Sequence, residues 1–464
     1  MSGTLETRRQ ARRFASRWDR FLSHPVPLWV LLLLLPFCLV LIILFGSLVR
    51  TADRSGRAGA IAMDIATIPR TMKRLLRGDH PYKPFRPYTD GPDALLPNGF
   101  WRNTAQPLVD PGYILLTSFS DALRRPVVRL LRLSDGVVVH EYRPDIDAIN
   151  ARSHFRSALV DLERDRGVGM NLMMHPLLMP DGGLVIHDTS PLARVDACGR
   201  VEWQIDGIFH HSAERGPDGA IWAVYRFPVP RMPNVAPTFN DEAILKASPE
   251  GRTLLLRRIS DILDANGLGT LWRSHPYVDD PFHLNDVQPV LTSGPYWQRG
   301  DLFLSLRNLS MIALYRPSAG KILWHRVGPW AMQHDVSIID DHRISVFDNH
   351  WRFAAPEGEV DGLNRIPVYD FATDTVHFPL VAATTLHHIA TRAQGRATPL
   401  PNGDMMVEET EHGRLLRVAP DGTIRWRYIS ADPARHRYQL RWSRYLDPIT
   451  DGPAILAAEH AQCA

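Results

Sequence analysis

The chain has 464 residues, with 53 Lys and Arg against 50 Asp and Glu, which gives a net charge of +3. This balance argues against nucleic acid as a partner, because nucleic-acid-binding domains normally carry a strong excess of basic residues. Hydrophobic residues make up 45% and charged residues 22% of the chain, which excludes a disordered protein. The 37 Pro, 31 Gly and 12 Trp favour an all-β fold with many turns.

An uncharged apolar segment covers residues 25–49 and is long enough to cross a membrane as a helix. Six arginines precede it and three follow closely, so the positive-inside rule predicts a cytoplasmic N-terminus and a periplasmic or extracellular C-terminal domain. A cleaved signal peptide is the alternative, but its apolar region is normally only about 7–15 residues long. We therefore predict a cytoplasmic tail at 1–24, a single-pass membrane helix at 25–49, a stalk and linker at 50–100, and a main domain at 101–464. A weakly amphipathic pattern within 51–80 predicts a short stalk helix.

A turn followed by a short apolar strand recurs through the main domain. The strands of its six copies begin, directly after the turn, at Tyr113, Gly183, Ala220, Leu302, Arg343 and Asp404. A strand, a turn and a further strand follow each copy, beginning at Val127, Leu192, Ala243, Met311, Ile366 and Leu415. Six units of about four strands predict an all-β fold, a six-bladed β-propeller preceded by the single N-terminal membrane helix. A β-sandwich is the alternative, although it does not require six matched pairs. Residues 259–267 are the exception and predict a short helix.

The three cysteines, Cys38, Cys198 and Cys463, lack the paired spacing of a zinc site or a redox motif. Two isolated residues are not enough to infer a disulfide between Cys198 and Cys463.

Several histidines occupy related positions in the repeat. Residues six to eight positions before a turn are expected where the innermost strand of a blade begins, and the residues there are His175, His211, His334 and Gln394. His283 lies further upstream of its turn, and Arg307 is on the strand that follows it. If the central channel gathers these side chains, they form a concave candidate active site.

Four of these side chains, His175, His211, His283 and His334, are also possible metal ligands. Arg307 argues instead for an anion such as sulfate or phosphate, because a guanidinium repels a divalent cation and binds oxyanions through two hydrogen bonds. The sequence therefore predicts no metal and no cofactor.

From about Tyr113 to Tyr428 the chain resembles the arylsulfate sulfotransferase family. These propeller enzymes move a sulfuryl group between phenols without a nucleotide sulfate donor. The most specific stretch is 283–350, which contains HLNDVQPV, SLRNLS and QHDVSI followed by FDN. The resemblance implies that His334 in QHDVSI is the nucleophile that becomes a sulfohistidine.

The same resemblance implies that His211, His283 and Arg307 grip the sulfuryl oxygens, with His210 as a neighbouring alternative to His211. His175 and Gln394 share the channel register and are predicted to bind substrate. We expect Asp335 to point to the opposite face of its strand, so that a group from another blade orients the ring of His334.

Soluble periplasmic members of the family carry an additional N-terminal β-domain and a disulfide, whereas this chain has an apolar segment and no obvious cysteine pair. The sequence predicts a membrane-anchored sulfotransferase that uses an aryl sulfate donor and a phenol or another hydroxyl acceptor. The alternative is a non-catalytic propeller that binds an envelope protein or polysaccharide. A quinone-dependent dehydrogenase ranks last, because neither a tryptophan docking motif in each blade nor a calcium-type acid cluster is evident.

Overall fold

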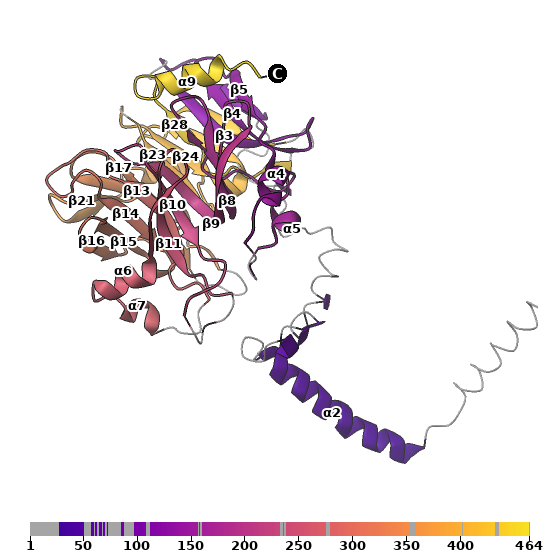
Figure 1. Ribbon diagram of the computed structural model, residues 1–464. Coiled ribbons are helices and arrows are strands. Elements are labelled where there is room, and N and C mark those ends of the chain that lie inside the picture. Colours follow the sequence, from indigo (N-terminus) through magenta and orange to yellow (C-terminus); the bar gives the residue numbers. More distant parts are fainter. Residues whose placement is uncertain are drawn as a thin grey trace, which may run out of the picture. The chain divides into compact units, whose positions relative to one another are not determined.

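The computed structural model describes residues 27–50, short helical pieces between 57 and 72, and residues 85–87, 97–107 and 112–463. Its gaps in the last range are at 156, 158–159, 233–234, 236–237, 275–278, 353–357, 401 and 432–435. The chain divides into two compact units, Met1–His80 and Pro81–Ala464. The elements of both units are labelled in Figure 1.

The first unit is dominated by one apolar helix, α2 (Leu28–Arg50), with Pro36 inside it. The mean hydropathy of its candidate span, Leu28–Val49, is 3.2, and none of this span is buried. Its length and composition are those of a membrane-spanning helix, as predicted for 25–49. The residues described between 57 and 72 are helical, as expected for the stalk, whereas the predicted cytoplasmic tail lies outside the described residues.

The second unit is an all-β, propeller-like fold made of antiparallel sheets. One sheet has the order β28 (Arg444–Leu446), β3 (Tyr113–Ser120), β4 (Arg125–Arg132) and β5 (Val138–Tyr142). A seven-stranded sheet contains β6 (Leu177–Leu178), β7 (Leu184–Ile186), β8 (Ser190–Val195), β9 (Val201–Arg215), β10 (Ile221–Arg226), β11 (Glu242–Ala247) and β12 (Thr253–Arg258). The long strand β9 pairs with β8 through residues 201–209 and with β10 through residues 208–215, so it joins two groups of four strands.

The remaining large sheets follow in chain order. One contains β13 (Leu284–Pro289), β14 (Leu302–Leu306), β15 (Met311–Arg316) and β16 (Lys321–Val327). The next contains β17 (His334–Ile338), β18 (Arg343–Phe347), β21 (Val368–Asp370) and β22 (Thr375–His377). The last contains β23 (Arg396–Pro399), β24 (Met405–Glu409), β25 (Arg414–Val418), β26 (Ile424–Ile429) and β2 (Gly99–Arg102).

Short elements complete the second unit. The small strand pairs are β1 (Phe85–Pro87) with β27 (His436–Tyr438), and β19 (Trp351–Arg352) with β20 (Glu359–Val360). The helices are α4 (Ile146–Ala151), α5 (Leu162–Arg166), α6 (Ile259–Ala265), α7 (Thr270–Arg273), α8 (Val381–Leu386) and α9 (Gly452–Glu459), with the 3₁₀ turns η1 (Arg307–Leu309) and η2 (Thr410–His412). Helix α6 confirms the helix predicted at 259–267.

Apolar side chains pack between successive sheets and close them into a ring. Leu115 of β3 and Leu184 of β7 share one cluster. Another cluster joins Leu116 of β3 to Leu415 of β25, so the last sheet packs against the first. Each sheet thus buries both of its faces against its neighbours, which explains why the predicted strands are so rich in apolar residues.

Hydrogen bonds also connect the first strand of one sheet to that of the next. A side chain on one of these strands accepts a backbone N–H from the next of them. These bonds join Ser212 Oγ to Val287 N at 2.9 Å, Asp286 Oδ2 to Val336 N at 2.8 Å and Asp335 Oδ2 to Ala397 N at 3.0 Å. They run from β9 through β13 and β17 to β23, so these strands surround a common centre.

The C-terminal segment returns to the beginning of the ring. β28 pairs with β3 in the first sheet, although the two strands are far apart in the sequence of the domain (Figure 1). Helix α9 follows, with Ile455 and Ala458 packed in the same core cluster as strands of the first two sheets. Cys463 then forms a disulfide with Cys198, which lies in the turn between β8 and β9.

The disulfide corrects the interpretation of the sequence, which found no obvious cysteine pair. The bonded residues are separated by 265 positions. They meet because ring closure brings the end of the chain back to the second group of strands, and no local motif records that contact.

Reduction of this disulfide should lower the free energy of unfolding by about 2–4 kcal/mol, because the cross-link restricts a very long loop of the unfolded chain. Denaturant titrations of the full chain with and without reductant measure the difference. The Cys198→Ser variant should be destabilised to a similar degree and should no longer respond to reductant. Identical unfolding curves for the oxidised and reduced protein would contradict this expectation.

Candidate active site

The site is built in, or within two residues of, the strands β6, β9, β13, β17, β23 and β28. Six residues at these places adopt the left-handed backbone conformation: His175, His211, His283, Asp335, Gln394 and Trp442, with φ values of 48°, 61°, 48°, 51°, 60° and 60°. This conformation costs roughly 1–2 kcal/mol for a residue with a Cβ, so the surrounding structure must hold it in place. Register shifts accompany it in β9, β13 and β17, and such bulges turn a side chain toward a new direction.

Three histidines from three different sheets meet at one place. The rings of His211 and His283 are 5.1 Å apart between centroids, those of His211 and His334 are 5.7 Å apart, and those of His283 and His334 are 6.3 Å apart. One nitrogen of each ring lies within 4.8 Å of the others. His211 and His334 are buried, whereas the side chain of His283 is 25% exposed and lies on the open side of the cluster.

Trp442 is a fourth member of the site that the sequence analysis missed. Its ring centroid lies 5.7 Å from that of His211 and 6.3 Å from that of His334, and the residue is fully buried. Trp442 lies two residues before β28, the strand that the C-terminal segment contributes to the first sheet. The repeat predicted from Tyr113 onward did not extend to this strand, although the left-handed backbone of Trp442 matches that of the histidines.

The tautomer of His334 follows from its hydrogen bond to Asn349. The amide nitrogen of Asn349 donates to the carbonyl oxygens of Gln394 at 2.7 Å and Thr391 at 3.3 Å. Asn349 Oδ1 therefore faces His334 and accepts from Nδ1 at 2.7 Å, so the lone pair of the neutral ring is on Nε2. Burial, together with the charge of Arg307, holds the pKa of His334 well below its ordinary value and keeps the ring neutral.

The residue that orients His334 is not the one expected. Asp335 does not contact this ring. It forms an ion pair with Arg396, whose Nε lies 3.1 Å from Asp335 Oδ1, and it accepts the backbone N–H of Ala397. The prediction that another blade supplies the orienting group is wrong, because Asn349 follows β18 in the same sheet and β18 pairs with β17. Asn349 is the last residue of FDN, which follows QHDVSI in the sequence, so this motif could have identified the orienting residue.

His283 is held by a carboxylate on its other side. Its Nδ1 donates to Asp280 Oδ2 at 2.5 Å, which leaves Nε2 as the ring atom free for chemistry. Burial favours the neutral form of Asp280, but the neighbouring His283 outweighs this effect and lowers the pKa of the carboxyl group. Asp280 was not predicted from the sequence, although its spacing of three residues from His283 is visible there.

Arg307 supplies positive charge beside the histidines. It begins η1 directly after β14, and its backbone N–H donates to the carbonyl oxygen of His283 at 3.0 Å. Its guanidinium donates to Asn308 at 2.7 Å and is close enough to His334 to lower the pKa of that ring. Three histidines spaced in this way also suit a metal ion, but a fixed cation at the same place favours an oxyanion.

The two residues predicted to bind substrate lie outside the cluster of three histidines. The ring of His175 is 5.5 Å from that of Trp442, and its nitrogens face Ala213 N, Arg396 and Glu214. Gln394 lies behind His334, where its carbonyl oxygen accepts from Asn349. Neither belongs to the cluster of three histidines, and their role in substrate binding stays a prediction.

Ionised groups continue below the histidines. Arg396 contacts Asp335 and Glu214, while Arg444 donates to Glu214 at 2.7 Å. Burial and the neighbouring Asp335 raise the pKa of Asp286 to about 8. These buried charges compensate one another and hold the first strands together.

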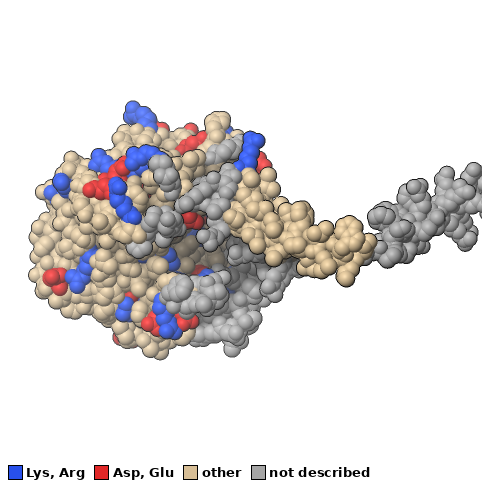
Figure 2. All heavy atoms as spheres, turned by 90° about the horizontal axis from the view of Figure 1, so that it is seen from below, with Lys and Arg blue, Asp and Glu red and all other residues tan. Residues whose placement is uncertain are grey.

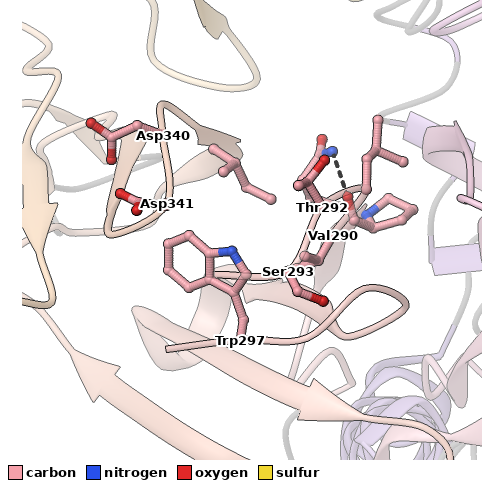
Figure 3. A pocket seen from close by; sticks show the side chains of 10 residues that line it. Val290, Thr292, Ser293, Trp297, Asp340 and Asp341 are labelled. Carbon is pink, nitrogen blue, oxygen red and sulfur yellow. Dashed lines mark hydrogen bonds between the residues drawn. The ribbon is translucent and has the colours of Figure 1, made fainter. Parts of the chain in front are cut away.

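A separate cavity of about 380 Å³ lies at the other ends of β13 and β17 (Figure 3). Trp297 and Ile338 contribute apolar walls, and Asp340 and Asp341 are at its rim. His283 and His334 precede or begin these two strands, whereas the cavity is lined by residues at their ends, so it is distinct from the histidine site. On the face seen in Figure 2, basic and acidic side chains of the described residues are interspersed, and no surface of a single sign is formed there.

The comparisons with known proteins identify a family. Among solved structures the chain is similar to a protein of unknown function from Bacteroides caccae, with a TM-score of 0.42 and 13% identity over 68% of this chain and 93% of that one. TolB from Acinetobacter baumannii gives a TM-score of 0.40 and 13% identity over 74% of this chain and 68% of that one. Virginiamycin B lyase from Staphylococcus aureus gives 0.32 and 14%, over 57% of this chain and 72% of that one.

No curated protein matches the sequence. The model of the arylsulfotransferase (ASST) family matches residues 180–431, which is more than half of the chain and includes all three clustered histidines and Arg307. The chain therefore belongs to the arylsulfotransferase family.

Proposed function

We propose that this protein is a membrane-anchored sulfotransferase that moves a sulfuryl group from an aryl sulfate to a hydroxyl acceptor through a sulfohistidine at His334. Family membership indicates aryl sulfotransferase activity. The observation that carries the mechanism is the hydrogen bond from His334 Nδ1 to Asn349, because it leaves a lone pair on Nε2 in a ring that burial keeps neutral. A neutral imidazole of this kind is a good nucleophile near neutral pH.

In the first half-reaction, His334 Nε2 attacks the sulfur atom and the bond from sulfur to the aryl oxygen breaks. Arg307 and His211 donate to the sulfuryl oxygens, where charge develops during transfer. His283 begins the step doubly protonated, with its Nδ1–H donated to Asp280, and gives the proton on Nε2 to the departing phenolate, which leaves the ring neutral. The products are a phenol and His334 with a covalent nitrogen–sulfur bond.

In the second half-reaction, the oxygen of the acceptor attacks the sulfur atom and the nitrogen–sulfur bond breaks. His283, which is now neutral at Nε2, takes the proton of the acceptor hydroxyl. Both rings return to their starting states, so the cycle requires no metal ion or cofactor. The partial exposure of His283 supports this assignment, since donor and acceptor oxygens must reach that ring.

We further propose that the propeller has six blades. Three observations on the described residues support this number. Six left-handed residues lie in, or within two residues of, β6, β9, β13, β17, β23 and β28. Six apolar clusters pack between groups of strands, and β9 serves as the outer strand of one blade and the inner strand of the next.

We propose that α2 anchors the protein in a membrane with the propeller on the periplasmic or extracellular side. The arginines before residue 25 support this orientation. The disulfide between Cys198 and Cys463 supports it independently, because such bonds persist mainly in oxidising compartments. A reporter that is active only in the cytoplasm should be inactive when it is fused after Ala464, and its activity there would contradict this topology.

The direct test is incubation of the full chain in detergent with p-nitrophenyl sulfate and a phenol. The expected result is release of p-nitrophenol together with sulfation of the added phenol, with ping-pong kinetics. Hydrolysis without a sulfated acceptor would contradict group transfer. Donor consumption that is the same with and without the protein would contradict the proposed activity.

Replacing Asn349 by Leu should lower kcat by about 10²-fold or more, because the wrong tautomer of a catalytic histidine is strongly inactivating. Asn349→Asp keeps an oxygen that accepts from His334 Nδ1 and should retain much more activity. Thermal unfolding of the variants shows whether the fold is intact, since Asn349 also bonds two buried carbonyl groups. Equal turnover of Asn349→Leu and the unaltered protein would contradict the assigned tautomer.

A further inference from the structure

Buried polar side chains extend from His211 away from the cluster of three histidines. His210 Nδ1 lies 2.7 Å from His211 Nδ1. On the opposite side of the His210 ring, Nε2 lies 3.6 Å from Glu242 Oε1. Within the part of the chain that the structure describes, neither of these two facing atoms has another hydrogen-bond partner. A small rotation of either side chain brings them into hydrogen-bond distance, and burial strongly favours that pairing.

The protonation state of Glu242 sets the direction of these hydrogen bonds. Glu242 is 1% exposed, and its oxygen lies within 4.8 Å of ligand atoms of Asp280 and His283. Glu242 is buried, and an ionised carboxyl group beside it disfavours a second negative charge. Asp280, whose side chain is 26% exposed, is the ionised one because it already pairs with His283 at 2.5 Å. The remaining proton is therefore on Glu242, whose Oε2 accepts the backbone N–H of Leu284 at 2.6 Å.

Charges around Glu242 agree with this assignment. Burial raises the pKa of Glu242 well above its ordinary value, and the charges of Asp280 and Asp241 reinforce the shift. Arg226 opposes it, as does the hydrogen bond from Leu284, but the net direction is upward. Glu242 Oε1 thus carries a hydroxyl hydrogen that it can donate to His210 Nε2.

The tautomers of the two histidines follow step by step. Burial keeps both rings neutral, since it lowers the pKa values of His210 and His211 well below the ordinary value. His210 accepts at Nε2, so its hydrogen is on Nδ1 and is donated to His211 Nδ1. His211 accepts at Nδ1, so its own hydrogen is on Nε2.

We infer that Glu242 and His210 are positioning residues that hold His211 with its N–H on Nε2, as a hydrogen-bond donor to the transferring sulfuryl group. This inference rests on the proposed function for the identity of the sulfuryl group. The assignment of the His211 tautomer does not depend on that function. The neighbouring rings of His334 and His211 are then opposite tautomers. His334 presents a lone pair for attack, held by Asn349, and His211 presents a donor, held by Glu242 through His210.

The tautomers are measured directly by ¹⁵N NMR of histidine-labelled full chain in detergent, with the signals assigned through the His211→Gln and His334→Gln variants. The expected result is a protonated Nε2 on His211 and a protonated Nδ1 on His334. Glu242→Leu should convert His211 to a mixture of tautomers and leave His334 unchanged. A hydrogen on His211 Nδ1 in the unaltered protein would overturn the inference, whatever the protein catalyses.

Kinetics of three variants give a second, independent test. Glu242→Leu should lower kcat about 10²-fold with little change in KM, as expected when a transition-state donor is lost. Glu242→Gln supplies both an N–H donor and an oxygen acceptor, so it should restore most of that loss. Glu250→Leu makes the same change at a side chain that is 67% exposed in the turn between β11 and β12, and it serves as the control. A Gln variant as impaired as the Leu variant would overturn the inference and indicate that an ionised carboxylate or a bound cation acts there.

Discussion

The His334→Ala variant should lose turnover by about 10⁴-fold or more, because it removes the proposed nucleophile, on which both proposed half-reactions depend. It should also lose the covalent intermediate. In the unaltered protein, mass spectrometry after brief exposure to donor, under mildly alkaline conditions, should show about 80 Da added to the peptide that contains His334, which is the mass of a transferred sulfuryl group. The same peptide of the variant should show no added mass. The bond is acid-labile, so acid treatment before analysis should remove the added mass.

Two further variants distinguish the nucleophile from its neighbours. His175→Ala should retain the adduct, since His175 contacts Trp442 and the ion pairs below the site and does not belong to the cluster of three histidines. His460→Ala changes an exposed histidine and should behave like the unaltered protein. Normal donor consumption by His334→Ala would mean that the nucleophile is another residue, with His211 or His283 the next to test.

The Arg307→Ala variant should lower kcat by about 10²–10³-fold, as removal of a single preorganised donor does in other enzymes. Its charge already lowers the pKa of His334, so it acts where the sulfuryl group would bind. Arg307→Lys should recover only part of the loss, because a point charge cannot supply two parallel hydrogen bonds to an oxyanion. Steady-state kinetics with donor and acceptor varied separately measure the effects on kcat and KM.

The control for Arg307 is Arg252→Ala, a loss of the same charge at a side chain that is 78% exposed. This variant should leave kcat unchanged, which excludes a general effect of net charge. Arg307→Ala should raise the pKa of His334 as well, and the pH dependence of kcat/KM should then shift upward. Equal activity of the Ala, Lys and unaltered proteins would remove Arg307 from the site.

The sequence was most informative about the strand that pairs with the innermost strand in each group of strands. Every copy of the predicted turn and strand coincides with an observed strand: β3, β7, β10, β14, β18 and β24. Alternating apolar residues and Gly-containing turns are local signals, and each sheet repeats them. β28 was missed because its place depends on ring closure, and no local pattern shows that a C-terminal strand pairs with β3. The disulfide between Cys198 and Cys463 escaped for the same reason.

The sequence allowed the clustered histidines of the site to be predicted, but not the hydrogen bonds that hold their rings. His211, His283 and His334 were identified from their register and from the family resemblance, and the structure brings these three together. Their supporting residues were missed or misplaced, because Asp280, Asn349 and Glu242 act only through contacts made after folding. Glu242 is the clearest case, since it lies in β11 and reaches His210 in β9 through a contact between the strands of different hairpins.

The position of β28 affects how the domain folds during its synthesis. Trp442 and β28 come from a segment that is synthesised after the strands bearing the three histidines. Domains fold as their sequence emerges, but here the first sheet stays without its innermost strand until β28 has been synthesised. A nascent chain that has already exposed His211, His283 and His334 therefore still lacks Trp442, whose ring packs against those of His211 and His334. We expect this order of assembly to delay completion of the histidine site until the segment with Trp442 and β28 has folded onto β3.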